Sequence, residues 1–383
     1  MHRILVLTSI LPIEKLSHKK DENDILLITE QKIKEYHKDI TFEYVYVQTY
    51  ANDFLGLFSK RWKEFASICK LDKITLKDKI VTIFPIIQIP KKISFRNILY
   101  RFSIFQNKER LDKLIKEFNP TIIHAQNADE SAYLAKYIKE KYDIPYIITV
   151  RGLNRGIDNI IHNNLINAKS LIAISPTQIK QLNKVEKNVN LIPHAVEDKF
   201  FIKNIKNNDS SKIKLVIIAR LIKLKNIDII INVLVNFKNF ELHIIGDGPE
   251  KESLSKLVTT LDIVHQVFFL GRKSHDEILN LLPNYDLFVM PSFPETLGRV
   301  YFEVMASSIP IVAAKHTGID GIITNGKEGF LIDHKSTQQL ANCFSKIETN
   351  PGLLLDMSRN ARELAKKYRW NETVKKYYNI YTA

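Results

Sequence analysis

Short runs of β-branched residues alternate with amphipathic stretches along most of this 383-residue chain, and this alternation constrains its fold more than any other feature. The pattern is typical of α/β units built around parallel sheets. The runs form two series, and the segment between them, KNIKNNDSSK at 203–212, has the composition of a linker. The sequence therefore predicts two doubly wound, Rossmann-like α/β domains with a boundary near residue 200.

Strands of the first series are expected at 3–9, 42–48, 80–84, 121–124, 146–150 and 171–174, and those of the second at 214–219, 241–246, 267–270, 287–291 and 309–313. Doubly wound sheets bind ligands beyond the carboxyl ends of their strands. We therefore expect the functional residues in the loops that follow these strands, and the site in a cleft between two facing domains.

Composition excludes several classes of protein. Hydrophobic residues make up 45% and charged residues 26% of the chain, which is ordinary for a globular protein. No apolar run reaches the roughly 18 residues of a membrane span. The only cysteines, Cys69 and Cys343, supply neither a disulfide framework nor a thiolate zinc site. The apolar stretch at 3–13 lacks a small-residue cleavage site and is interpreted as a first strand, so we expect a cytoplasmic protein.

The most informative segment is PSFPETLGRVYFEVMASSIPIVAA at 291–314. A strand is expected to end at Pro291, a loop then carries Glu295, and a helix that begins near Gly298 carries Glu303. Free N–H groups at the start of that helix can hold an anion. Taken alone, the two glutamates could also be a capping acid and a solvated helix residue.

This segment resembles the signature of family 4 glycosyltransferases, in which two glutamates are separated by seven residues. Further similar segments follow the family's order: VIIARLIKLKNIDIIINVL (216–234), LHIIGDGPEKESL (242–254), VFFLGRKSHDEILNLLPNYDLFVMPS (267–292) and NGKEGFLID (325–333). The resemblance implies the GT-B fold, with an acceptor-side domain at 1–200 and a donor-binding domain at 201–367. It also implies that the final helix, 368–383, packs back on the first domain.

Departure of a nucleoside diphosphate from a sugar develops negative charge, which a cation must stabilise. No two aspartates in this chain are separated by a single residue, so the common Asp-x-Asp metal motif is absent and no metal site is predicted. Arg220 and Lys225, expected at a strand end and a helix start that Asn226 could cap, are placed to supply the charge. We therefore assign them a catalytic role together with Glu295.

By resemblance, Glu295 would contact the donor sugar and Glu303 the ribose hydroxyls. The remaining candidate binding residues are Thr296, Leu297 and Gly298 for the diphosphate, Arg272 for the base, and Gly246 for close approach of the backbone. In the first domain, Thr149-Val150-Arg151-Gly152 replaces the family's usual Thr-x-His-Gly phrase. Arg151 could there bind a phosphate or an acidic acceptor, but could not act as a base.

These expectations describe a retaining hexosyltransferase that moves a sugar from a nucleotide-diphosphate donor to a cell-envelope, capsular or lipid-linked glycan. The nucleotide sugar is a substrate, no cofactor is expected, and a uridine donor is favoured over a guanosine donor. A sugar-nucleotide epimerase of the same fold is the alternative enzyme. A basic nucleic-acid-binding protein is the alternative from another class, since the net charge is +14.

Basic residues concentrate at 60–116, which holds 15 Lys and Arg against 5 Asp and Glu. Lys91, Lys92, Arg96 and Arg101 and the aromatic residues Trp62, Phe65, Phe95, Tyr100, Phe102 and Phe105 lie within it. This combination suits contact with anionic lipid headgroups, so a peripheral position at the inner face of the cell membrane is predicted. The alternative is a solvated charged face over core aromatics.

Overall fold

In the computed structural model, the described residues are 1–13, 16, 24–88, 95–153, 156–185, 187–202, 212–350 and 352–383. They form two compact units. Unit 1 comprises Met1–Ile174, Gln178–Ile192 and Val374–Ala383, and unit 2 comprises Ser175–Thr177 and Pro193–Thr373. The change from one unit to the other after Ile192 comes before the expected boundary near residue 200, and residues 203–211 of the linker-like segment lie outside the described part.

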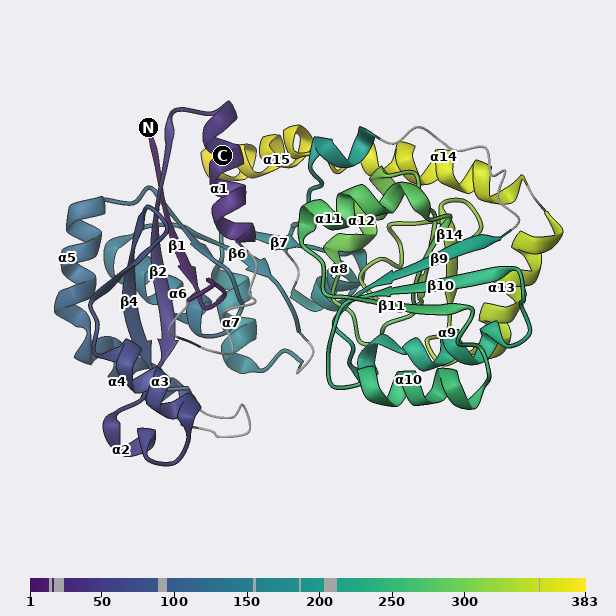
Figure 1. Ribbon diagram of the computed structural model, residues 1–383. Coiled ribbons are helices and arrows are strands. Elements are labelled where there is room, and N and C mark those ends of the chain that lie inside the picture. Colours follow the sequence, from purple (N-terminus) through teal and green to yellow (C-terminus); the bar gives the residue numbers. More distant parts are fainter. Residues whose placement is uncertain are drawn as a thin grey trace. The chain divides into compact units, whose positions relative to one another are not determined.

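Unit 1 contains an eight-stranded sheet of order β3-β4-β2-β1-β5-β6-β7-β8 (Figure 1). All neighbouring strands are parallel except β3 and β4. The strands are β1 (His2–Thr8), β2 (Ile40–Thr49), β3 (Lys73–Leu76), β4 (Lys79–Ile86), β5 (Ile122–Ala125), β6 (Tyr146–Val150), β7 (Ser170–Ala173) and β8 (Val189–Leu191).

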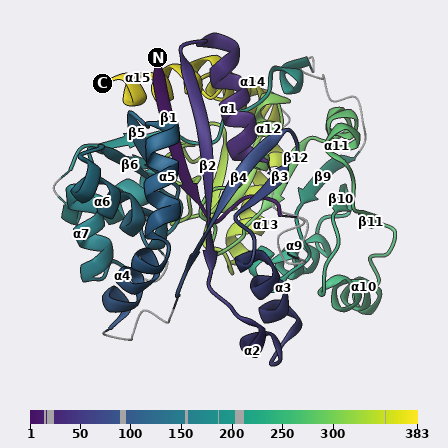
Figure 2. The ribbon, with the colours of Figure 1, turned by 90° about the vertical axis from the view of Figure 1, so that its left-hand side faces the viewer.

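Helices cover both faces of this sheet, with α4 to α7 on one side and α1 and α3 on the other (Figure 2). They are α1 (Ile25–Tyr36), α2 (Asp53–Gly56), α3 (Lys60–Cys69), α4 (Arg96–Gln106), α5 (Lys108–Phe118), α6 (Glu130–Tyr142), α7 (Asn159–Asn167) and α8 (Pro176–Leu182). Because side chains alternate across a strand, Leu5 and Leu7 pack in the core under α4 to α7.

Unit 2 contains a wholly parallel six-stranded sheet of order β11-β10-β9-β12-β13-β14. The strands are β9 (Ile213–Ile218), β10 (Phe240–Ile245), β11 (Val267–Gly271), β12 (Leu287–Met290), β13 (Ile311–Ala314) and β14 (Gly329–Ile332). The helices are α9 (Ile227–Leu234), α10 (Lys251–Thr260), α11 (His275–Leu281), α12 (Arg299–Ala306), α13 (Thr337–Thr349) and α14 (Leu353–Lys366). Two parallel α/β sheets of this kind confirm the predicted fold class.

The last helix, α15 (Trp370–Thr382), joins unit 1 from residue 374 onward. There the Tyr381 hydroxyl lies 2.8 Å from His124 Nδ1, and the Tyr378 hydroxyl donates to Asp39 Oδ2 at 2.8 Å. Tyr377 and Tyr381 are buried, so the aromatic residues of this helix contribute to packing.

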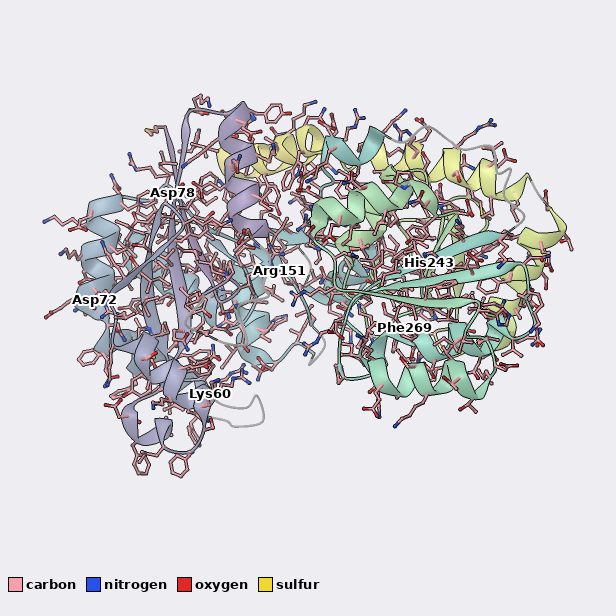
Figure 3. The ribbon with its side chains drawn as sticks, viewed as in Figure 1. Lys60, Asp72, Asp78, Arg151, His243 and Phe269 are labelled. Atoms are coloured by element: carbon pink, nitrogen blue, oxygen red, sulfur yellow. The ribbon has the colours of Figure 1, made fainter. Side chains whose placement is uncertain are left out.

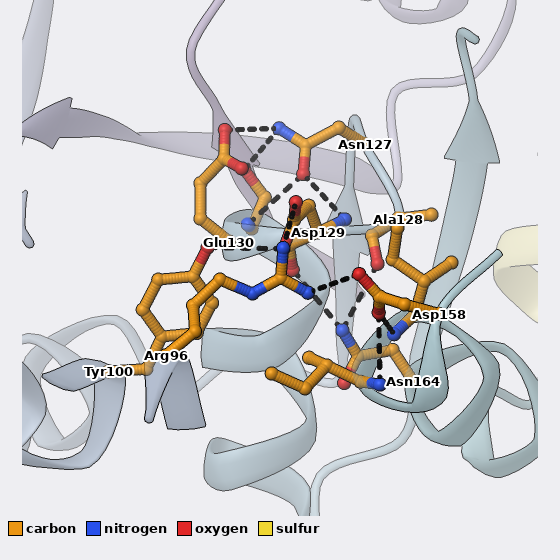
Figure 4. Close-up of polar contacts among 11 residues, drawn as sticks. Arg96, Tyr100, Asn127, Ala128, Asp129, Glu130, Asp158 and Asn164 are labelled. Atoms are coloured by element: carbon orange, nitrogen blue, oxygen red, sulfur yellow. Dashed lines mark hydrogen bonds and ion pairs between the residues drawn. The ribbon is translucent and has the colours of Figure 1, made fainter. Parts of the chain in front are cut away.

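Helix α4 is anchored by Arg96, whose assignment to a basic lipid-facing surface was wrong. Its side chain is 3% exposed and makes ion pairs with Asp158 at 2.6 Å and Asp129 at 3.5 Å (Figure 4). The Tyr100 hydroxyl, also expected at that surface, donates to Asp129 at 3.1 Å from a buried position. A buried guanidinium needs such partners, because an unpaired charge in the interior is costly. Phe65 is likewise buried, whereas Lys91 and Lys92 lie outside the described residues.

Candidate active site

Five predicted site residues follow the carboxyl ends of neighbouring strands in unit 2. Arg220 follows β9, Gly246 follows β10, Arg272 follows β11, and Glu295 and Thr296 follow β12. The order of the sheet reverses between β9 and β12, since β10 and β11 lie on one side of β9 and β13 and β14 lie beyond β12. Such a reversal point is where α/β sheets bind ligands.

Lys225 and Glu295 meet at this reversal point. The Lys225 ammonium donates to Glu295 Oε2 at 2.7 Å, and both side chains are largely buried, at 19% and 16% exposed. Ser292 Oγ donates to the same carboxylate oxygen at 3.1 Å. Glu295 Oε1 accepts no hydrogen bond from the described residues, so one oxygen of this carboxylate is available to a ligand.

Glu303 lies on α12 and is also held through a single oxygen. His275 Nε2 lies 3.1 Å from Glu303 Oε1, and Arg299 Nη2 lies 3.6 Å from the same atom. Arg299 is one helical turn before Glu303 on α12, which brings the two side chains together. Within the described chain, Glu303 Oε2 has no hydrogen-bond partner and can accept from a bound hydroxyl group.

The start of α12 carries the predicted anion-binding backbone. The helix begins at Arg299 with Gly298 at its N-cap, and no side chain caps it. The N–H groups of Leu297, which precedes the N-cap, and of Gly298, the N-cap itself, donate to no other described residue. Both groups are therefore available to an anion beside Glu295.

Arg220 is exposed and its guanidinium makes no hydrogen bond or ion pair within the described ranges. Arg272 is exposed after β11. Neither guanidinium forms a hydrogen bond or an ion pair with Lys225 or Glu295. The structure thus joins Lys225 to Glu295, and positions Arg220 and Arg272 at the same edge of the sheet.

Asn226 does not act as the predicted helix cap. Its backbone is left-handed, with φ of 50°, and its side chain makes no capping hydrogen bond to α9. Instead, Asn226 Nδ2 donates to the Pro291 carbonyl oxygen at 2.7 Å. This bond ties the loop that carries Lys225 to the end of β12, and so helps to position the lysine against Glu295.

Two glycines permit the close backbone packing of these loops. A Cβ at Gly246, where φ is +144°, would lie 1.9 Å from the Ala219 carbonyl oxygen, next to Arg220. A Cβ at Gly318 would lie 1.6 Å from the Thr296 carbonyl oxygen, and Gly318 N donates to the Glu295 carbonyl at 3.0 Å. In this structure, the close approach predicted at Gly246 is between two segments of the protein's own backbone.

Arg151 belongs to unit 1, where it follows β6 (Figure 3). Its Nη2 and Nε donate to Gln126 Oε1 at 2.8 and 3.1 Å, and burial lowers the pKa of the guanidinium. Nearby, burial and the charge of Arg151 lower the pKa of His124 to about 3, so this imidazole is neutral. His124 Nε2 lies 2.7 Å from Thr149 Oγ1.

Sequence reasoning missed three residues of this site, namely Ser292, His275 and Arg299. Ser292 is three residues before Glu295, and Arg299 is four before Glu303 on one helix, so local spacing could have indicated both. His275 is 28 residues from Glu303, and only the fold brings the two side chains together.

Family models match two parts of the chain. Residues 198–364 match the model described as "Glycosyl transferases group 1", and residues 77–175 match the model "Glycosyl transferase 4-like". The first match contains all the candidate residues of unit 2, and the second contains Arg151.

Two relatives and one solved structure are representative of the similar proteins. The sulfoquinovosyl transferase SQD2 of Arabidopsis thaliana is 29% identical over 306 residues, which are 70% of this chain and 58% of that enzyme. The alpha-monoglucosyldiacylglycerol synthase of Acholeplasma laidlawii is 24% identical over 339 residues, or 77% of this chain and 83% of the synthase. The chain therefore spans less than two thirds of the length of SQD2.

Anabaena HepE, solved in complex with UDP, superimposes with a TM-score of 0.69 at 16% identity and full coverage of both chains. At that identity, the likeness concerns the fold. The two sheets and the structural likeness show the GT-B fold, and the matches of the two family models at 77–175 and 198–364 support a glycosyltransferase.

Proposed function

We propose that the protein is a retaining hexosyltransferase that takes its sugar from a nucleotide-diphosphate donor bound by unit 2. The observation that carries this proposal is the Lys225–Glu295 pair at the reversal point of the sheet, with Arg220 at the same edge. The ammonium of Lys225, held by Glu295, and the exposed guanidinium of Arg220 can stabilise the charge that develops on a departing diphosphate. Because the Lys225 ammonium is already held in place, little free energy is needed to reorganise it during the reaction.

Each carboxylate keeps one oxygen for the donor. Glu295 Oε1 is available to the hydroxyl groups of the transferred sugar, and Glu303 Oε2 to the ribose. The backbone N–H groups of Leu297 and Gly298 would hold the diphosphate, Arg272 would approach the base, and Arg151 would bind an anionic group of the acceptor. Because Lys225 and Arg220 supply the positive charge, we propose that the transfer requires no divalent metal.

The relatives support the choice of substrates. HepE was solved with UDP, which favours a uridine donor over a guanosine donor. The name of the Acholeplasma enzyme gives a glucosylated diacylglycerol as its product. We therefore propose a lipid-linked or cell-envelope glycan as the acceptor.

We place the reaction in the cytoplasm, at the inner face of a membrane. Cys69 and Cys343 are both unpaired thiols, which suits a reducing compartment. In the part of the chain that the structure describes, no helix combines the length and the apolar character needed to cross a bilayer.

A thermal-shift screen of nucleotide sugars tests the proposed donor class. A donor that binds only the folded protein raises its free energy of unfolding, by about 2.7 kcal/mol at a donor concentration a hundredfold above the Kd. The thermal midpoint rises accordingly. UDP-sugars should raise the midpoint more than GDP-sugars. Conversion of the best donor to an epimer without any acceptor would instead identify an epimerase, and stabilisation by nucleic acid alone would identify the rival binding protein.

A further inference from the structure

The loop after β2 carries three large apolar side chains into solvent. Phe54, Leu57 and Phe58 are 65%, 81% and 69% exposed, and the two phenylalanine rings contact edge to face with centroids 5.4 Å apart. They belong to the hairpin of α2 and α3, which lies at an extremity of unit 1 in both ribbon views (Figures 1 and 2). We call residues 53–63 the tip.

The tip is a built feature of the fold. Asn52 Oδ1 accepts from Leu55 N at 3.0 Å and caps α2, while Ser59 Oγ accepts from Trp62 N at 3.2 Å and caps α3. Lys70 and Asp53 form an ion pair of 2.7 Å that joins the two ends of the hairpin. The two caps and the ion pair stabilise the hairpin in the arrangement that exposes these apolar side chains.

Helix α4 presents a second exposed apolar face. Ile98, Phe102 and Phe105 are 66%, 49% and 73% exposed, and their spacing of four and three residues aligns them along one side of the helix. The opposite side, with Tyr100 and Ile104, is buried in the core of unit 1. The described residues therefore leave one apolar face of α4 uncovered.

The tip and the α4 face lie at the same end of unit 1. The tip follows the carboxyl end of β2, α4 follows that of β4, and these two strands are parallel neighbours. Both ribbon views place α2 and α4 at the lower end of unit 1 (Figures 1 and 2). The two apolar surfaces can therefore engage one extended partner together.

Cations flank both surfaces. Lys60, Arg61 and Lys63 lie on the tip, with Lys60 labelled in Figure 3, and Arg101 is exposed beside the α4 face. None of these four side chains makes an ion pair with a described residue. Protruding aromatic and aliphatic groups, flanked by cations that form no ion pair with a described residue, complement a bilayer with anionic headgroups, which accepts both kinds of group at one interface.

We propose that the tip and the α4 face form a membrane-docking surface that inserts Phe54, Leu57, Phe58, Ile98, Phe102 and Phe105 between anionic lipids. This proposal names the surface by which the protein would bind the inner face of a membrane. It rests on the proposed membrane location and not on the proposed donor or reaction. Two separate protruding elements, both flanked by cations, favour a fluid anionic partner. The chain would then dock with the carboxyl edge of the unit 1 sheet toward the lipid.

Flotation with vesicles of phosphatidylcholine alone or with phosphatidylglycerol tests this proposal. The parent should bind the anionic vesicles. The triple variant Phe54→Ser, Leu57→Ser and Phe58→Ser should bind them about tenfold or more weakly, because the affinity for a membrane scales with the apolar area that is buried in it. The triple change Ile98→Ser, Phe102→Ser and Phe105→Ser should act similarly. The control, Val264→Ser with Phe268→Ser, removes two exposed apolar groups from unit 2 and should bind like the parent.

The charges are tested separately. Changing Lys60, Arg61 and Lys63 to Ser should reduce binding to anionic vesicles and remove most of its salt dependence, since the Debye length falls from about 10 Å at 0.1 M to 3 Å at 1 M salt. Changing the exposed Lys238, Lys251 and Lys327 of unit 2 to Ser has the same effect on net charge and should leave binding unchanged.

Three results would overturn the proposal: no binding of the parent at low salt, equal binding of both apolar triple variants and the parent, or a parent dimer that these variants dissociate. Circular dichroism shows whether each variant is folded. Stabilisation by UDP reports on unit 2 and should persist in every variant. A protein that floats with vesicles but ignores nucleotides would contradict the proposed donor instead.

Discussion

At the scale of single residues, the site is defined by two carboxylates, each of which has one oxygen bound by side chains of the protein. Glu295 and Glu303 are held through Oε2 and Oε1 respectively, by a lysine and a serine in one case and by a histidine and an arginine in the other. These contacts fix the rotamer of each carboxylate before a ligand binds. The entropy of ordering the side chains is therefore already lost before catalysis begins.

Arg220 should matter to the rate of the reaction far more than to folding. Its guanidinium is exposed, so Arg220→Ala should leave the thermal midpoint within about 1 °C of the parent, because exposed substitutions change stability little. Turnover should fall about a hundredfold or more, the scale of losing one preorganised charge contact. The control is Lys223→Ala, which removes another exposed cation from the same loop. Equal loss in both variants would argue for a general effect of charge.

Glu303 should act on the binding of the donor. In Glu303→Ala, the carboxylate that would accept from the ribose is lost, and the Kd for UDP should rise about tenfold or more, since hydrogen bonds to charged groups contribute about 1.5–3 kcal/mol. Calorimetric titration measures this Kd. An unchanged Kd, with a folded variant, would remove Glu303 from the nucleotide site.

His124 should make the stability of the protein sensitive to acid. Its folded-state pKa is lowered to about 3, below the ordinary value of about 6.5. As the pH falls below 6.5, the unfolded chain takes up a proton that the folded state refuses, so stability is lost and the loss from this group reaches about 2 kcal/mol at pH 5.

Thermal midpoints at pH 7 and pH 5 check this dependence. The midpoint of His124→Asn should fall less between the two pH values than that of the parent, whatever its value at pH 7. His162→Asn, which changes an exposed histidine of the same unit, should keep the parent's response. Identical pH responses of all three proteins would show that His124 is protonated in the folded state.

At the scale of elements, the β-branched runs predicted the central strands well and the marginal strands poorly. All eleven expected strands appear, whereas β3, β8 and β14 were not expected. β3 is an antiparallel edge strand in which Lys73 and Thr75 are exposed, and β8 is three residues long, so neither has the apolar run of a central strand. β14 begins at Gly329, within the segment 325–333 that was interpreted only as a family motif and not as a strand.

The same contrast holds for the site. The ends of the strands predicted which loops would carry Arg220 and Glu295, because parallel strands bring their carboxyl ends to one edge. The sequence did not predict the hydrogen bond from Asn226 to Pro291, since an asparagine before a helix is normally a cap. Burial of Arg96 was also hidden, because its partners Asp129 and Asp158 are more than 30 residues away.

The loop that carries Glu295 should be sensitive to added volume at Gly318. In Gly318→Ala the new methyl would overlap the Thr296 carbonyl oxygen, so the backbone of residues 295–298 must shift. We expect loss of UDP binding and a fall in the thermal midpoint, because overpacking costs about 1–3 kcal/mol. Gly352→Ala, where the nearest atom would be at 3.7 Å, is the matched control and should be neutral. Normal UDP binding by Gly318→Ala would mean that this loop does not form the site.

At the scale of the whole molecule, the chain divides its roles between two sheets. Unit 2 carries the Lys225–Glu295 and His275–Glu303 contacts, while unit 1 carries Arg151 and the exposed apolar tip. The chain returns to unit 1 through residues 374–383, whose tyrosines contact His124 and Asp39. The net charge of +14 favours anionic partners for the molecule in general, and we propose a diphosphate as the anion that the site in unit 2 binds.

The central claim is that Lys225 and Arg220 stabilise the departing diphosphate in place of a metal. The most direct measurement is the rate of UDP release from the best UDP-sugar in excess EDTA, for the parent and for Lys225→Ala. We predict that the parent keeps its full rate in EDTA, and that Lys225→Ala loses about a hundredfold or more with or without added magnesium. An absolute dependence of the parent on magnesium or manganese, or a fully active Lys225→Ala, would contradict the account.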